Sequence, residues 1–434
     1  MSEKGVSSPL INLNLNVRGM SQSATLRINE VSRKMMAEGR RIYRLGLGQS
    51  PFPVPQVVQD ELKANSHQKD YLPVLGLQEL RESIVEHVRR HQGTTFMPEN
   101  VIVGPGSKEL MFILQLVYYG DLLILTPSWV SYGPQALIIG RHIKWIPTHA
   151  SDDWRVTPSA IEKICSADPD RPRLMILNYP ANPHGGTYTE EELRTIAEIA
   201  AKYRIVLLSD EIYGHLHYEG RHVSISRYYP EGTIVSAGLS KWCGAGGWRL
   251  GYFAFPQPLA QLKDMMAVVA SETYTSTSAP IQYAAVRAFK GGIAIEQYLQ
   301  HCRRVLRALG GYMRERLLNS GAEVIEPKGA FYLFPDFGPF AKNLKARGIT
   351  TSEELCDGLL KDTGVAILPG SAFGREPEEL TARLSYVDFD GAKAICAAQE
   401  IPVSQPLDEA FLRSYCQNCV EATELMCNWV LRKS

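Results

Sequence analysis

The sequence predicts an α/β fold in which a mostly parallel sheet carries helices on both faces, together with a smaller α+β domain. Short apolar runs alternate with helix-like segments from about residue 98 to residue 290, and this alternation is typical of a parallel sheet covered on both faces. A long helical stretch at about residues 293–318 then leads into a region of mixed strands and helices. The length of 434 residues is enough for two domains with large cores.

The strands of the main sheet are expected at the short apolar runs. These runs lie at residues 100–103, 122–125, 174–177, 205–208, 234–235 and 252–255. We expect residues 49–294 to form the large domain. Residues 1–48 are expected to be the amino-terminal part of the small domain, and residues 295–434 its remainder with a carboxyl-terminal helical extension.

The composition argues against nucleic-acid and membrane-surface partners. Lys plus Arg and Asp plus Glu both number 46, so no global charge attracts a polyanion. The segment from Met1 to Met20 lacks the pattern of an export signal, and no uncharged apolar run is long enough to span a membrane. We therefore expect a soluble cytoplasmic protein whose partner is a small molecule.

The cysteines favour reduced thiols over a disulfide framework. There are eight in a long chain without an export signal. Cys416 and Cys419 form a Cys-x-x-Cys pair inside a helical pattern at residues 411–430, but no second pair or histidine set accompanies them. We expect core or surface helix cysteines here and no metal site.

Two of the expected strands end in segments rich in polar side chains. Asn178 to Gly186 follows the run at residues 174–177 and precedes a capping box at residues 189–192. Ser209 to Tyr213 follows the run at residues 205–208. Open α/β sheets bind their ligands at the carboxyl ends of the strands, so both segments are candidates for a binding site.

Lys241 provides the first indication of the chemistry. It lies in a turn of small residues, and Arg249 follows eight positions later. A lysine amine can attach to the aldehyde of pyridoxal phosphate, and the planar fork of an arginine suits a phosphate. Alternatively, this is a surface loop whose lysine is ordinary and whose arginine pairs with a carboxylate.

The two strand-end segments favour the cofactor site. Asp210 would pair with the pyridine nitrogen and keep it protonated, while Asn182 and Tyr213 would donate hydrogen bonds to the phenolate oxygen of the ring. Taken singly, Asp210 could be a helix cap and Asn182 a turn residue. Together, in this order before Lys241, they predict a pyridoxal phosphate site.

The ordered motifs resemble those of the class I aminotransferases, a branch of the fold-type I pyridoxal-phosphate transferases, and are similar to the bacterial aspartate aminotransferases. The resemblance covers roughly residues 20–390. It rests on the Asn-Pro turn, the Asp-x-x-Tyr element, the Ser-Lys with Gly-Trp-Arg-Leu-Gly-Tyr, and the late Arg-Leu-Ser-Tyr at residues 383–386. It implies that the large domain binds pyridoxal 5'-phosphate and that the enzyme is a homodimer with shared active sites.

The resemblance assigns further cofactor contacts. Gly106 and Ser107, in a turn between a strand and a helix, would cap the phosphate, since helix amino termini attract anions. Trp129 would stack on the pyridine ring, and Tyr71 would reach the phosphate of the neighbouring subunit. Many relatives carry serine where this chain has Gly238, so one phosphate hydrogen bond is expected to be absent or moved to Ser240. Without the resemblance, Trp129 reads as a core residue and Tyr71 as part of a turn.

The resemblance also assigns the substrate contacts. Arg383, with Gly48 and Asn182, would hold the α-carboxylate, because a bidentate arginine fixes both its position and its orientation. Lys241, once released, would move the proton between Cα and the C4′ atom of the cofactor. Lys108 would read the distal carboxylate of aspartate or glutamate; alternatively it belongs to the phosphate cradle or faces water.

Three functions remain open at this point. The leading function is aminotransfer between an L-amino acid and a 2-oxo acid, with acidic substrates as the better pair. The second is another reaction on the same fold, such as a carbon–sulfur β-lyase or the reaction of an aminocyclopropane-carboxylate synthase. The third is a cofactor-binding regulator, which lacks support because the sequence carries no DNA-binding domain or basic arm.

Overall fold

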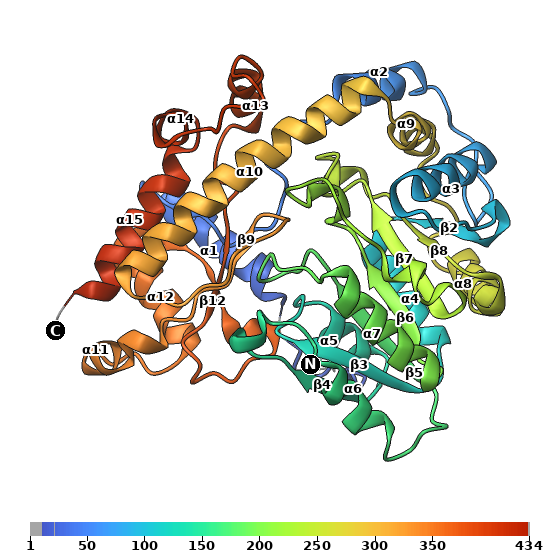
Figure 1. Ribbon diagram of the computed structural model, residues 1–434, viewed down its shortest axis with the longest axis horizontal. Helices are drawn as coiled ribbons and strands as arrows, with labels where there is room; N and C mark the ends of the chain where they lie inside the picture. Colours follow the sequence, from blue (N-terminus) through green and yellow to red (C-terminus); the bar gives the residue numbers. More distant parts are fainter. Residues whose placement is uncertain (1–10, 21, 433–434) are drawn as a thin grey trace, which may run out of the picture.

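The computed structural model describes residues 11–20 and 22–432, and a seven-stranded sheet lies at its centre (Figure 1). The strand order is β2-β8-β7-β6-β5-β3-β4. Neighbouring strands from β7 to β4 are parallel, whereas β8 is antiparallel to both of its neighbours. The strands are β2 Val101–Gly104, β3 Asp121–Thr126, β4 Ile143–Pro147, β5 Arg173–Asn178, β6 Val206–Asp210, β7 Thr233–Gly238 and β8 Gly251–Ala254.

Helices cover both faces of this sheet, as the alternation predicted. Side chains alternate along β3: Leu122 and Ile124 pack on one face, and Leu123 and Leu125 on the other. The first face is covered by α4 Ser107–Val117 and α8 Ala260–Ser271, and the second by α6 Pro158–Cys165 and α7 Glu190–Lys202. The α7 helix begins with the predicted capping box, in which Thr189 and Glu192 exchange hydrogen bonds.

The sequence did not indicate β4, because this edge strand lacks an apolar run. Only Ile146 is buried in it, while Lys144 and Trp145 are exposed. Its partner on one side is β3, and its other edge has no strand. Because β4 buries little side-chain surface, it has no hydrophobic run to reveal it, whereas β2 at the opposite edge is buried throughout and was predicted.

A second group of strands lies beside the long helix α10 Ile293–Ser320, to the left of the large sheet in Figure 1. Its first sheet pairs β1 Tyr43–Arg44 with β10 Val365–Ala366, so residues near both ends of the chain meet. Its second sheet has the order β11-β12-β9, formed by β11 Leu368–Pro369, β12 Ala382–Ser385 and β9 Tyr332–Leu333. The α10 helix spans residues 293–320, close to the predicted 293–318.

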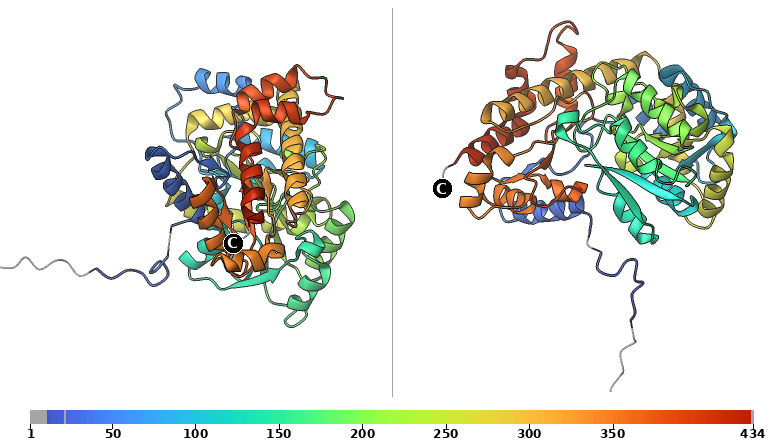
Figure 2. Two further views of the ribbon diagram at one scale, coloured as in Figure 1. Left: turned by 90° about the vertical axis from the view of Figure 1, so that its left-hand side faces the viewer. Right: turned by 60° about the horizontal axis from the view of Figure 1, so that its bottom comes forward.

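The remaining helices surround these sheets (Figure 2). They are α1 Ala24–Ala37, α2 Gln56–Ala64, α3 Gln78–Gln92, α5 Tyr132–Ile138, α9 Ala279–Lys290, α11 Ala341–Ala346, α12 Ser352–Thr363, α13 Gly391–Gln399, α14 Glu409–Tyr415 and α15 Gln417–Leu431. No helix within residues 11–20 and 22–432 combines the length and apolarity that crossing a membrane requires.

The carboxyl-terminal helical pattern is divided, which corrects the prediction of one helix over residues 411–430. The chain bends at Cys416, whose φ of −125° is not helical, so α14 and α15 are separate helices. The bend lets both helices pack on α10. Cys416 and Cys419 are buried free thiols, and the other six cysteines are free as well.

Candidate active site

A cavity of about 400 Å³ opens at the carboxyl ends of β5 and β6. Most of the residues that the sequence singled out contribute to its wall. The lining consists of Gly48, Gln49, Ser107, Lys108, Trp129, Asn178, Asn182, Asp210, Ile212, Tyr213, Ser240, Lys241, Gly246, Gly247 and Arg249. The cavity therefore lies where the topology of an open α/β sheet predicts a ligand.

Asp210 is the last residue of β6 and is 3 % exposed. Its Oδ2 atom accepts a 2.6 Å hydrogen bond from the Tyr132 hydroxyl, whereas Oδ1 has no partner. Burial raises the pKa of Asp210 to about 6, although the hydrogen bond from Tyr132 acts in the opposite direction. A buried carboxylate oxygen without a donor is costly, so this site fits a ligand that presents a protonated ring nitrogen.

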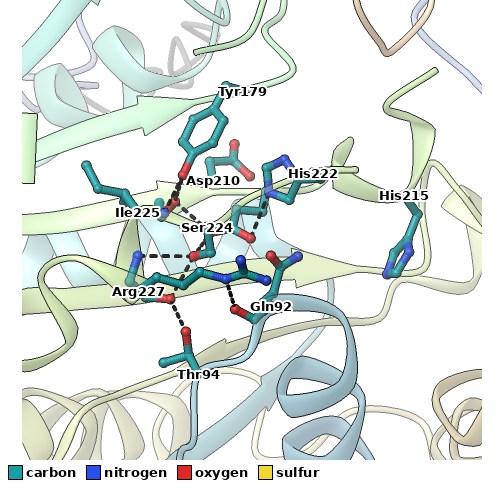
Figure 3. A network of polar contacts seen from close by, with 12 residues as sticks. Gln92, Thr94, Tyr179, Asp210, His215, His222, Ser224, Ile225 and Arg227 are labelled. Carbon is teal, nitrogen blue, oxygen red and sulfur yellow. Dashed lines mark hydrogen bonds and ion pairs between the residues drawn. The ribbon is translucent and has the colours of Figure 1, made fainter. Parts of the chain in front are cut away.

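A polar network behind Asp210 holds the end of this strand in place (Figure 3). The neighbouring Glu211 accepts hydrogen bonds from Ser209 at 2.8 Å and from Ser224, and it lies 3.0 Å from Nε2 of His222. Ser224 continues the network to Ser226, which contacts Thr94 at 2.8 Å. All of these groups are buried, so their hydrogen bonds fix the backbone that presents Asp210.

Lys241 lies in the turn after β7, with its amine directed into the cavity. Its Nζ atom donates a 2.6 Å hydrogen bond to the carbonyl oxygen of Gly48. Burial, together with the positive charge of Arg383, lowers the pKa of Lys241 to about 8. A depressed pKa increases the neutral fraction of the amine, which is the form that attacks an aldehyde.

The anionic end of the cavity is formed by Arg249, Lys108 and the start of α4. Arg249 donates to the carbonyl oxygens of Gly246 at 2.9 Å and Pro105 at 3.0 Å. Neither Arg249 nor Lys108 has a carboxylate partner within the described part of the chain. Partial burial and the charge of Arg249 lower the pKa of Lys108. Two unpaired cations beside a helix amino terminus fit a phosphate.

Three glycines bring the phosphate turn close to the sheet. Gly104, Gly251 and Gly238 are opposite one another across β2, β8 and β7. A Cβ atom on Gly251 would lie 2.3 Å from the backbone nitrogen of Ser107. A Cβ atom on Gly238 would lie 2.7 Å from the carbonyl oxygen of Leu250. This packing accounts for glycine at position 238.

The side walls carry the groups predicted to contact the ring. Trp129 lies on one side, with Nζ of Lys108 5.5 Å from its ring centroid. The Tyr213 hydroxyl is 2.7 Å from the Tyr332 hydroxyl. Asn182 accepts a 3.2 Å hydrogen bond from Nη1 of Arg383 through its Oδ1 atom. Asn182 thus connects the cavity to the arginine behind it.

Arg383 is a buried guanidinium without an ionic partner among residues 11–20 and 22–432. Its Nη2 atom donates to the carbonyl oxygen of Gly46 at 2.5 Å, and Nε has no partner. Its guanidinium carbon lies 4.8 Å from the Tyr332 ring and 5.0 Å from the Phe373 ring. Burial lowers its pKa. A buried cation of this kind is stabilised by an incoming carboxylate.

Three of the predicted contacts do not line the cavity, namely Gly106, Arg383 and Tyr71. Gly106 lies beside the guanidinium of Arg249 at the start of α4, Arg383 lies behind Asn182, and Tyr71 lies on the surface. Its side chain is 89 % exposed, in the loop between α2 and α3. Ser240 does line the cavity.

The sequence analysis missed Tyr132 and Tyr332 as site residues. Tyr132 belongs to the segment that carries Trp129, but nothing in its sequence indicates that it bonds to Asp210. Tyr332 reaches Tyr213 from β9, far along the chain. No local motif reports such a contact.

Comparison with known proteins agrees with this geometry. The model of the family "Aminotransferase class I and II" matches residues 40–397. The aspartate aminotransferase of Geobacillus stearothermophilus is 34% identical over 381 residues, which covers 85% of this chain and 93% of that protein. A probable aspartate/prephenate aminotransferase of Thermus aquaticus is 33% identical, covering 86% of this chain and 94% of that protein.

A solved structure shows the same architecture. The aspartate aminotransferase from Thermus thermophilus with maleate superimposes with a TM-score of 0.81 at 28% sequence identity, covering 97% of this chain and all of that one. The chain therefore belongs to the class I and II aminotransferases, and it is a pyridoxal-phosphate-dependent enzyme of fold type I.

Proposed function

We propose that this aminotransferase prefers acidic substrates, with aspartate or glutamate as amino donor and 2-oxoglutarate as one acceptor. The observation that carries the proposal is a set of three cations without carboxylate partners in the described residues: Arg249, Arg383 and Lys108. The loaded site with an acidic substrate presents three anionic groups, namely the phosphate, the α-carboxylate and the side-chain carboxylate. Each cation then has one anion to bind.

The names of the similar proteins support this substrate class. Relatives from Geobacillus and Thermus are named for aspartate or for aspartate and prephenate, and the Thermus thermophilus structure holds maleate, a dicarboxylate. The second candidate, β-elimination or cyclopropane formation, has no comparable support.

The proposed roles of the residues follow from their positions. Pyridoxal phosphate supplies the electron sink for the electrons of the Cα–H bond. Asp210 would hold a proton on the ring nitrogen, and Asn182 and Tyr213 would donate to the ring oxygen. Arg383 would orient the substrate through its α-carboxylate. The amine of Lys241, which the carbonyl oxygen of Gly48 positions, would take up the proton of Cα and return it to the cofactor.

The first experiment is an assay of the purified enzyme with a panel of amino acids and 2-oxoglutarate. We expect glutamate to form fastest from aspartate. Release of pyruvate with ammonia or a thiol, without an acceptor, would instead indicate elimination.

Substitution of Lys108 tests the preference for acidic substrates. In Lys108→Ala we expect the KM for aspartate to rise about tenfold or more, because a desolvated carboxylate loses its charge partner. The KM for alanine or phenylalanine should hardly change. Lys108→Arg, which keeps the charge, should recover part of the aspartate affinity. Equal losses for acidic and neutral substrates would place Lys108 in the phosphate cradle and remove the basis for the proposal.

We also propose a symmetric dimer in which Tyr71 completes the phosphate site of its partner. The support is the 89 % exposure of Tyr71 and the exposed apolar side chains at residues 11–20. The backbone of this segment reaches outward from the body of the molecule (Figure 2). Exposed apolar groups of this kind mark contact surfaces.

Eight free thiols suit a reducing compartment such as the cytoplasm, which is the location that we propose.

A further inference from the structure

Three histidines form a compact cluster outside the active-site cavity. His87 and His91 are four residues apart on α3, so they lie on the same face of the helix. His215 belongs to a short 3₁₀ turn, Gly214–Leu216, that follows Tyr213. One ligand nitrogen from each histidine lies within 4.8 Å of the other two. Within residues 11–20 and 22–432 this is the one such group of histidine, cysteine or carboxylate side chains.

The three rings lie against one another. The centroid of His87 is 4.5 Å from that of His91 and 4.7 Å from that of His215, and His91 and His215 are 4.9 Å apart. Figure 3 shows His215 set apart from the network around Glu211 and Ser224. No part of the proposed aminotransfer mechanism uses these three side chains.

The hydrogen bonds of His87 orient its metal-binding nitrogen. Its Nδ1 atom lies 3.2 Å from the carbonyl oxygen of Phe289, which requires the proton on Nδ1. The other nitrogen, Nε2, then presents a lone pair, and it lies 2.7 Å from Nε2 of His215. A ring nitrogen that donates to a backbone carbonyl while the opposite nitrogen is free is the usual arrangement of a metal-ligating histidine.

The surroundings provide access and a fourth position. His91 is the most exposed of the three, with 30% of its side chain accessible, and its Nε2 atom lies 3.9 Å from Oε1 of Glu296. Glu296 lines an open cavity of about 730 Å³. Two arginines lie near His91, and each has a carboxylate: Arg90 is 3.6 Å from Glu86, and Arg303 is 4.0 Å from Glu296. Glu86 is shared with Arg89, so these carboxylates offset only part of the positive charge around His91.

We infer that His87, His91 and His215 bind a divalent transition metal ion, with zinc as the best fit and Glu296 or water in the fourth position. Three imidazoles and an oxygen form a common tetrahedral zinc site. Zinc–nitrogen bonds of about 2.0–2.1 Å separate tetrahedral ligand atoms by about 3.3 Å. The Nε2 atoms of His87 and His215, which are 2.7 Å apart, must therefore separate by about 0.6 Å, and the His91 nitrogen, which lies within 4.8 Å of them, must move closer. The ion would tie α3 to the turn after Tyr213, and so to the cofactor site. This inference does not depend on which substrate the enzyme uses.

The test is zinc binding by the holoenzyme after treatment with a chelator. Isothermal titration with zinc chloride should show one ion per chain, and zinc should raise the thermal unfolding temperature. In His91→Gln the affinity should fall by a factor on the order of 100, because one ligand is lost. His91 is partly exposed, so this substitution leaves the core intact.

His217→Gln is the matched control, since His217 lies two residues beyond His215 and outside the cluster. It should bind zinc as the wild type does. The inference is overturned if the wild type binds no zinc, or if His91→Gln binds and is stabilised by zinc as strongly as the wild type. The second result would place the ion elsewhere, for example on exposed Cys396.

Discussion

Asp210 shows how a single active-site residue lowers the stability of the fold when no ligand is bound. Its pKa is raised from 3.8 to about 6 by burial, and one of its oxygens has no donor. Between these two values the folded carboxyl keeps a proton that the unfolded chain has released. Its contribution to stability is therefore complete below pH 3.8 and is lost as the pH rises through about 6.

This linkage predicts the behaviour of Asp210→Asn without cofactor. The amide cannot ionise, so at about pH 8 the cofactor-free variant should be more stable than the cofactor-free wild type, by up to about 3 kcal/mol. At about pH 5 the difference should fall to roughly half of that, and below pH 3.8 it should disappear. Thermal unfolding at both pH values measures it. A variant that is less stable at the higher pH would show that the carboxylate is already well solvated.

With cofactor bound, Asp210→Asn should impair catalysis, although it stabilises the cofactor-free fold. The amide cannot hold a proton on the ring nitrogen, so proton removal from the substrate should slow by orders of magnitude. Single-turnover kinetics provide the measurement.

Lys241 supports a second prediction at the residue scale. Lys241→Ala should lack a covalent link to the cofactor and lose about 10⁴-fold or more in turnover, because both the attachment point and the proton carrier are gone. Borohydride reduction followed by mass spectrometry should find the cofactor attached only to the wild type. Near-normal turnover of the variant would contradict the assignment.

The residues found from the sequence are those that belong to short motifs. Asp210, Asn182 and Lys241 each follow an apolar strand, so their place at the sheet edge could be predicted. Tyr332 and the histidine cluster could not, because their contacts join segments far apart in the chain. Such pairings depend on the packing of whole elements.

At the scale of elements, the row of three glycines sets the distance between the sheet and the phosphate turn. Gly251→Ala should push the Ser107 amide away and weaken cofactor binding by about tenfold or more, since an added Cβ atom has no room there. Gly247→Ala is the control, because a Cβ atom at that cavity residue meets nothing within 4 Å. Fluorescence titration with pyridoxal phosphate compares the two. Equal affinities would mean that the turn can shift without loss.

The elements themselves were predicted best where burial is complete. The expected runs match β2, β3, β5, β6, β7 and β8 to within a few residues, because these strands have both faces covered. The edge strand β4 and the bend at Cys416 have no comparable signal, since exposed strands lack apolar runs and a bend of one residue keeps the helical pattern on both sides.

At the scale of the whole molecule, the proposed dimer predicts complementation between two inactive variants. When Tyr71→Phe and Lys241→Ala chains mix at random, half of the dimers are hybrids, and one of their two sites carries neither change. About a quarter of wild-type activity should return. Native mass spectrometry, which separates the hybrid from both parents by mass, checks that mixing has occurred. If Tyr71→Phe alone is as active as the wild type, Tyr71 has no role in the shared site.

The division of the chain at residues 48 and 294 stays a prediction. The largest apolar cluster contains Val58 and Leu239 from the expected large domain as well as Leu333 and Trp429 from the expected small one. The two regions thus share one core.

The connection between these regions has a practical consequence for protease mapping. Residues 293–320 form one continuous helix, about 42 Å long at 1.5 Å per residue, and one side of it is buried against the shared core. Proteases cut exposed loops and chain termini. This helix offers no such extended segment. Cleavage should therefore begin at the amino-terminal residues 11–20 or near residues 400–406, and fragments that separate the two regions should appear only after global unfolding.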